Sequence, residues 1–215
     1  MSEAAPGLPD APEFATPQRA QLAEAMRELI DAVMVSHAVD DDELVGVAEE
    51  VRRLAFRLSG GAARTEAPGY RPRSHGDYLP RSPIVGEASP LSPRIDWDAV
   101  DDHVEARGTF TAAYEGPPGF VHGGMIALAF DEMLGIANIV GGHPGMTGTL
   151  TVRYRRPTPL YRELWFKAWV ERVEGRRIIS KGEVWAGDTM CAEAEGIFIQ
   201  PRPELAEQYF GARDS

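Results

Sequence analysis

The feature that most constrains the fold is an apolar segment from His122 to about Val140, whose side chains are apolar around nearly the whole circumference of a helix. A helix without a polar face has to be buried. Four segments in which polar and apolar residues alternate follow it, near 146–156, 163–173, 176–187 and 189–200, and this alternation is typical of half-buried strands. Because only these strands can cover the helix, the sheet is predicted to curl around it.

A further strand is predicted before the helix, where alternation begins near residue 100 and reaches Tyr114. The turn-forming run Glu115-Gly116-Pro117-Pro118-Gly119 ends it, and Glu174-Gly175 is predicted to form a tight turn between two later strands. The predicted class is therefore α+β with the hotdog fold, a curled antiparallel sheet around one long buried helix.

The N-terminal part has a different periodicity. Thr16-Pro17 is a helix start signal, and apolar residues at helical spacing predict one helix after it and a second that ends at Gly60 and Gly61. Prolines then recur up to Pro93, which disfavours regular elements. We predict a helical extension over 1–60, a proline-rich linker over 61–93, the hotdog domain over 94–203 and a tail over 204–215.

Composition excludes several classes of function. The net charge of −11 over 215 residues repels phosphate backbones, which argues against nucleic-acid binding. No uninterrupted apolar run approaches the roughly 20 residues of a membrane span, so none is expected. The N-terminal residues do not resemble a secretory signal, and we expect a cytoplasmic protein. The single cysteine, Cys191, is interpreted as a packing residue.

Asp131 lies inside the apolar helix, where an ionised carboxylate requires a partner. A lone Asp in a helix is better explained by solvent exposure at a helix end or by a structural hydrogen bond. His122-Gly123-Gly124 opens the same helix, and free amides at a helix N-terminus suit an oxyanion. The glycine pair also fits a tight loop that needs a permissive backbone.

Gly123 and Asp131 are eight residues apart, which separates them by roughly 12 Å along a helix. One copy therefore cannot place both groups on one carbonyl. If they share a substrate, two subunits with antiparallel helices would bring Gly123 of one to Asp131 of the other. A homodimer is expected, and the sequence leaves open whether two dimers assemble into a dimer of dimers.

These motifs resemble the hotdog thioesterase superfamily, in particular the branch of phenylacetate-pathway thioesterases and mammalian thioesterase superfamily members. The resemblance rests on His122-Gly123-Gly124, Asp131 and the stretch 146–160, MTGTLTVRYRRPTPL. Residues 173–177 (VEGRR) and 192–198 (AEAEGIF) extend it. It covers roughly residues 83–200, and residues 1–80 lie outside it.

The resemblance implies hydrolysis of an acyl thioester, with Asp131 as nucleophile or general base and the Gly123 amide in the oxyanion hole. Thr147 would orient the carboxylate or the water, although a strand threonine is also common for its β-propensity alone. His122 would position the glycine turn or hydrogen-bond near the thioester. Some relatives hold the water with Asn or Gln about six residues before the histidine, where this chain has Gly116.

Coenzyme A is expected to enter only as part of the substrate, with no cofactor. The resemblance places Gly124 and four arginines at its contacts: Arg153, Arg155, Arg176 and Arg177. Guanidinium groups suit phosphates, and the same arginines also fit a solvated strand face that balances the acidic residues. The five histidines lack metal-ligand spacing, so no metal is expected.

The predicted function is acyl-coenzyme A thioesterase activity on medium- or long-chain fatty acyl or aryl substrates, in fatty acid metabolism. Two alternatives keep the fold. One is a non-catalytic acyl-coenzyme A binding or regulatory module, in which a buried carboxylate beside the thioester would have no purpose. The other is a hotdog hydratase, whose proton transfers use a different arrangement of Asp and His.

Overall fold

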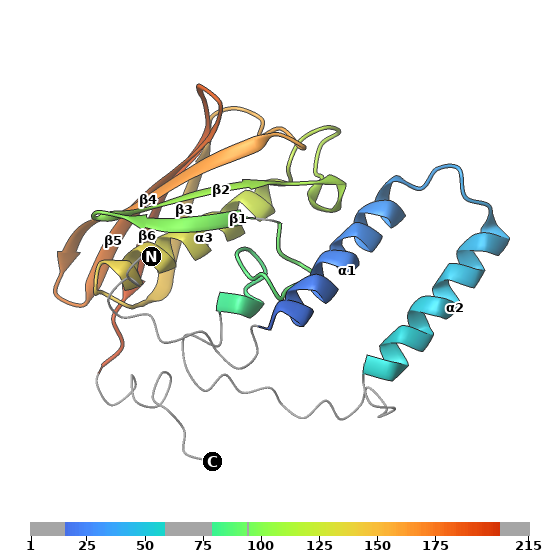
Figure 1. Ribbon diagram of the computed structural model, residues 1–215. Coiled ribbons are helices and arrows are strands. Elements are labelled where there is room, and N and C mark those ends of the chain that lie inside the picture. The colour runs from blue at the N-terminus through green and yellow to red at the C-terminus, as the bar shows by residue number, and fades with distance from the viewer. Residues whose placement is uncertain (1–15, 59–78, 94, 203–215) are drawn as a thin grey trace, which may run out of the picture.

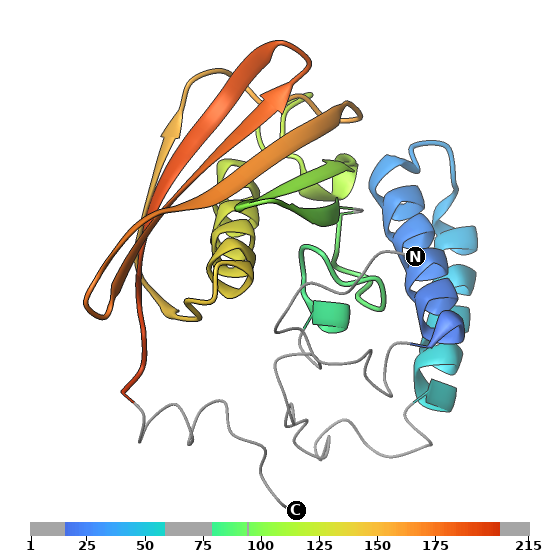
Figure 2. The same cartoon turned by 60° about the vertical axis from the view of Figure 1, so that its left-hand side comes forward.

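The computed structural model describes residues 16–58, 79–93 and 95–202. Its six strands are β1 (Ile95–Val100), β2 (His103–Thr109), β3 (Met146–Tyr154), β4 (Glu163–Glu174), β5 (Arg177–Ala186) and β6 (Thr189–Ile199). They form one antiparallel sheet in the order β1-β2-β4-β5-β6-β3. The long helix α3 (Gly123–Val140) lies in the curve of this sheet (Figures 1 and 2). The predicted hotdog fold is confirmed.

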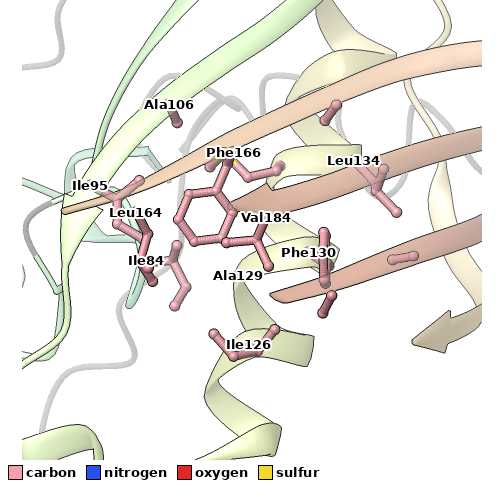
Figure 3. Close-up of a cluster of buried hydrophobic side chains, with 14 of the residues drawn as sticks. Ile84, Ile95, Ala106, Ile126, Ala129, Phe130, Leu134, Leu164, Phe166 and Val184 are labelled. Carbon is pink, nitrogen blue, oxygen red and sulfur yellow. The ribbon is translucent and has the colours of Figure 1, made fainter. Parts of the chain in front are cut away.

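The core lies between α3 and the concave face of the sheet. Ile126, Phe130 and Leu134 of α3 are almost fully buried among side chains from β2, β4 and β5 (Figure 3). The rings of Phe130 and Phe166 meet edge to face with centroids 6.5 Å apart. Among the described helices, α3 alone is long and apolar enough to cross a membrane, but half of it is buried, as is typical of a core helix.

The predicted first strand differs from the structure at both ends. The single strand predicted from the alternation near residue 100 corresponds to two strands, because Ile95, Trp97 and Ala99 already alternate with polar residues in β1. The strand does not continue to Tyr114: β2 ends at Thr109, opposite the first residue of β4, and Ala112–Tyr114 forms the 3-10 helix η4. There the Ala112 amide donates to the Tyr161 hydroxyl at 3.0 Å instead of to a strand.

The two predicted N-terminal helices are present as α1 (Pro17–Val35) and α2 (Asp41–Leu58). The Thr16 hydroxyl caps α1 by accepting from the Arg19 amide at 3.3 Å. The expected helix end at Gly60 and Gly61, residues 61–78 of the predicted linker and the predicted tail lie outside the described residues. The short 3-10 helix η3 (Leu79–Arg81) begins the part of the linker that the structure describes.

Hydrogen bonds between residues far apart in the sequence attach α1 to the hotdog domain. The Thr111 hydroxyl donates to Asp31 Oδ1 at 2.6 Å, and Arg27 donates to the Ser89 carbonyl at 2.8 Å. Tyr114, in η4 beside α1, donates its hydroxyl to the Leu91 carbonyl. Burial, followed by the nearby Asp31 charge, raises the pKa of Tyr114 to about 12, so this hydroxyl stays protonated at neutral pH. The extension is therefore docked on η4, the segment that precedes α3.

Candidate active site

The N-terminus of α3 is held by His122. The Nδ1 atom of its ring accepts from the Gly124 amide at 3.0 Å, which makes His122 the N-cap. An accepting Nδ1 places the ring proton on Nε2. The expectation that both glycine amides are free is therefore corrected, because the cap occupies Gly124. Within the described residues the Gly123 amide has no acceptor, so it is the donor left for an oxyanion.

Two further contacts fix the backbone of this turn. The His122 amide donates to the Tyr114 carbonyl at 2.9 Å. The Tyr154 hydroxyl at the end of β3 donates to the Gly123 carbonyl at 2.8 Å. Sequence reasoning missed Tyr154, although it continues the alternation of Leu150 and Val152, both of which pack against the core. These two hydrogen bonds hold the peptide groups before and after the one that carries the Gly123 N–H, so they fix the direction of that N–H.

Asp131 occupies the third turn of α3 and is half-buried. Thr147 of β3 donates its hydroxyl to Asp131 Oδ1 at 2.7 Å. Of the two partners that the resemblance implied for Thr147, the carboxylate or the water, the structure shows a hydrogen bond to the carboxylate. Because the hydroxyl holds one carboxylate oxygen, the other oxygen keeps a defined direction and remains able to accept a proton or attack a carbonyl.

A β-bulge allows Thr147 to reach the helix. On β3, Leu150 and Val152 face the core, so simple alternation would turn Thr147, with Thr149 and Thr151, to the outer face. The register between β3 and β6 shifts between Thr147 and Thr149, and Thr147 lies opposite the buried Phe198. The inserted residue, Gly148, changes the parity of the strand and directs Thr147 inward.

Thr147→Val is expected to lower kcat for the hydrolysis predicted from the sequence about tenfold, because a hydrogen bond to a charged group contributes roughly 1.5 kcal/mol. Thr147→Ser, which keeps the hydroxyl, should retain most of the activity. Steady-state kinetics of both variants provide the measurement. Equal rates for the valine and serine variants would show that the hydroxyl has no role.

The predicted coenzyme A contacts fall into two groups that do not meet within one chain. Arg153 and Arg155 both lie near Glu193, and Arg155 forms the shorter ion pair. Arg176 donates to the Gln200 carbonyl. Arg177 is paired with Ile199 of β6, which is paired in turn with Met146, so Arg177 lies at the end of β3 opposite to Arg153. The seven residue-to-residue steps from Met146 to Arg153 span roughly 23 Å of strand. Their contact with coenzyme A stays a prediction.

In the described part of the chain, neither Cys191 nor a metal-binding cluster offers a second reactive site. Burial raises the pKa of the Cys191 thiol, which disfavours the nucleophilic thiolate. Among the described residues, no cluster of three or more His, Cys, Asp or Glu side chains is arranged to hold a metal. Asp131, with the helix N-terminus eight residues before it, remains the strongest candidate for chemistry.

Comparisons with known sequences find similarity to thioesterases. The family model described as the thioesterase superfamily matches residues 118–193. Acyl-coenzyme A thioesterase THEM4 of Xenopus laevis is 36% identical over 91 residues, which cover 41% of this chain and 41% of that protein. Acyl-coenzyme A thioesterase THEM5 of Homo sapiens is 27% identical over 88 residues, covering 40% and 36%. The match thus spans about two fifths of these curated relatives.

A solved structure shows a longer similarity. The crystal structure of a thioesterase superfamily protein is 34% identical and superposes with a TM-score of 0.75, covering 84% of this chain and 94% of that one. Residues 95–199 make up only about half of the chain. The similarity therefore extends into the part of the chain that precedes the hotdog domain.

Proposed function

The chain belongs to the thioesterase superfamily, and on that premise we propose that it hydrolyses acyl-coenzyme A thioesters to a free acid and coenzyme A. The observation that carries the proposal is the hydrogen bond from Thr147 to Asp131, in a helix whose N-terminus presents the Gly123 amide. The named relatives are acyl-coenzyme A thioesterases, which supports the substrate class. Medium- or long-chain acyl and aryl groups are the proposed acyl portions.

In the proposed reaction, the Gly123 amide donates to the thioester carbonyl oxygen as negative charge develops on it. Asp131 either removes a proton from the attacking water or attacks the carbonyl carbon itself. In both routes the C–S bond breaks and the sulfur leaves as the coenzyme A thiolate. The thiolate then takes up a proton. In the second route, water then hydrolyses the acyl-aspartyl anhydride. The proposed reaction uses only water and the substrate, without a cofactor.

The proposed active site is shared between two subunits. Gly123 and Asp131 lie on one helix, roughly 12 Å apart along its axis, so one substrate carbonyl cannot contact both in a single chain. β3 is an edge strand of nine residues, most of them exposed, with an unpaired side. Such edges are usually covered. Antiparallel pairing of β3 with its copy across a two-fold axis would cover this edge and bring the two helices together.

The same pairing supports the proposed coenzyme A contacts. Antiparallel β3 strands place the Arg153 end of one subunit beside the Met146 end of the other, near which Arg177 lies. The two arginine groups that are separated within one chain would then approach each other across the interface. Guanidinium groups from both subunits could bind the phosphates of one coenzyme A.

Thiol release from a panel of acyl-coenzyme A substrates of different chain length tests the proposal. Saturated thioesters should release coenzyme A, and the most active substrate identifies the acyl class. Hydration of an enoyl-coenzyme A without thiol release would support a hydratase instead. Binding of acyl-coenzyme A, measured by calorimetry, without turnover of any substrate would support the binding module and reject catalysis.

A further inference from the structure

The helix α2 carries an apolar seam that the rest of the described chain leaves uncovered. α2 has no buried residue, and in both views it lies on the side of α1 away from the sheet (Figures 1 and 2). Four of its apolar side chains on one face are between 37% and 66% exposed. With the half-buried Val51, the α2 seam consists of Leu44, Val47, Val51, Leu54 and Leu58.

The spacing of the α2 seam is that of a coiled coil. Its residues are separated by three, four, three and four positions, which is the a/d repeat of two complete heptads. A helix that only borders solvent has no need of this repeat over its whole length. The residues on the two flanks also follow it: Ala48 and Ala55 occupy one flank, and Glu43, Glu50 and Arg57 occupy the other.

The charges on α2 favour a second copy of the same helix as the partner. Its first turn is acidic, with Asp41, Asp42 and Glu43, and its last turn carries Arg57. Neither Glu43 nor Arg57 forms an ion pair within the described part of the chain. In an antiparallel pair, the flank that holds these residues faces its own copy, so Glu43 meets Arg57 of the partner subunit at both ends. A parallel pair would place them against alanines.

The centre of such a pair brings Glu50 close to its own copy, which is unfavourable. Arg53 lies 3.8 Å from Glu50 within the same helix and offsets part of this repulsion. The alanines on the opposite flank allow close approach of the helix axes. The two ends of the helix pair therefore contribute electrostatic attraction between Glu43 and Arg57, and its centre contributes apolar contact.

We infer that α2 is a self-association surface, on which two copies of the chain pair their α2 seams antiparallel about a two-fold axis. This surface is separate from the edge of β3. α1, which carries α2, lies against the 85–96 segment and β1, and β1 and β3 are at opposite ends of the sheet. Association through α2 is consequently independent of the proposed dimer. Where both operate, the assembly contains four chains if the two two-fold axes meet at right angles, and more chains otherwise.

Light scattering coupled to size-exclusion chromatography of the full chain tests the inference. Leu54→Glu places a charge in the seam and should halve the mass of the assembly. The matched control is Val45→Glu, because Val45 is 59% exposed on the same helix but lies outside the seam. It should keep the wild-type mass. If both variants keep that mass, or both change it equally, the seam is not the interface.

Charge exchange tests the antiparallel direction. Glu43→Arg alone and Arg57→Glu alone should each raise the dissociation constant for α2 pairing about tenfold, which is about 1.4 kcal/mol, since each turns two attractive ion pairs into repulsive ones. The double variant should restore wild-type association, as measured by sedimentation velocity. A double variant as weak as the single ones would reject the antiparallel pairing. Circular dichroism should show folded protein throughout, because α2 contributes no core residue.

Discussion

Asp131→Asn is expected to lower kcat for acyl-coenzyme A hydrolysis at least about a hundredfold, the size expected when a positioned acid–base group is lost. The side chain keeps its shape, and its carbonyl oxygen still accepts from the Thr147 hydroxyl. It no longer removes a proton from water or attacks a carbonyl. KM should change much less than kcat, because the carboxylate contributes to the transition state more than to substrate binding. Thiol release under saturating substrate measures the effect.

Two controls show whether the asparagine substitution changes the catalytic step alone and leaves folding and substrate binding intact. Asp131 is half-buried and is not one of the core residues, so the variant should unfold near the wild-type temperature. Binding of a non-hydrolysable acyl-coenzyme A analogue should also persist. A variant that keeps its rate within a few fold would remove Asp131 from the mechanism and leave its bond to Thr147 as a structural contact.

The architecture could be predicted from the sequence because its two dominant patterns exclude alternatives. The segment that forms α3 has no polar face wide enough for solvent, and the strands after it contain runs in which buried and more exposed residues alternate, as in β4 and β6. The first strand was missed because β1 contributes little burial: only Ile95 of its six residues is buried. Short edge strands carry the weakest periodic signal, so their number is harder to predict than the fold.

The candidate site was predictable in its composition and less so in its geometry. The need to explain a carboxylate in an apolar helix identified Asp131, and the family resemblance identified Thr147. Alternation alone would have directed Thr147 away from Asp131, because no periodic rule reveals the bulge at Gly148. Whether the Gly124 amide is free also depends on the rotamer of His122, which sequence patterns do not encode.

Gly116→Ala is the second variant for which a large effect is expected. A Cβ atom at this position would lie 2.7 Å from His122 Cα and 3.2 Å from its backbone nitrogen, which is closer than backbone atoms tolerate. The turn before α3 would have to move. Overpacking of this kind costs roughly 1–3 kcal/mol of folding free energy. The displacement also redirects the Gly123 amide, and a shift of about 1 Å in a reacting group can cost up to about a hundredfold in rate.

The matched control for this substitution is Gly46→Ala, because a Cβ at Gly46, inside α2, meets no atom within 4 Å. It should be neutral or slightly stabilising, since alanine favours the helix by up to about 1 kcal/mol. Thermal unfolding and kcat measured on both variants separate the steric effect from the loss of a glycine. A Gly116→Ala protein with wild-type stability and rate would show that the turn adapts. The expected loss of both would show that the turn before α3 has no room for a side chain at Gly116.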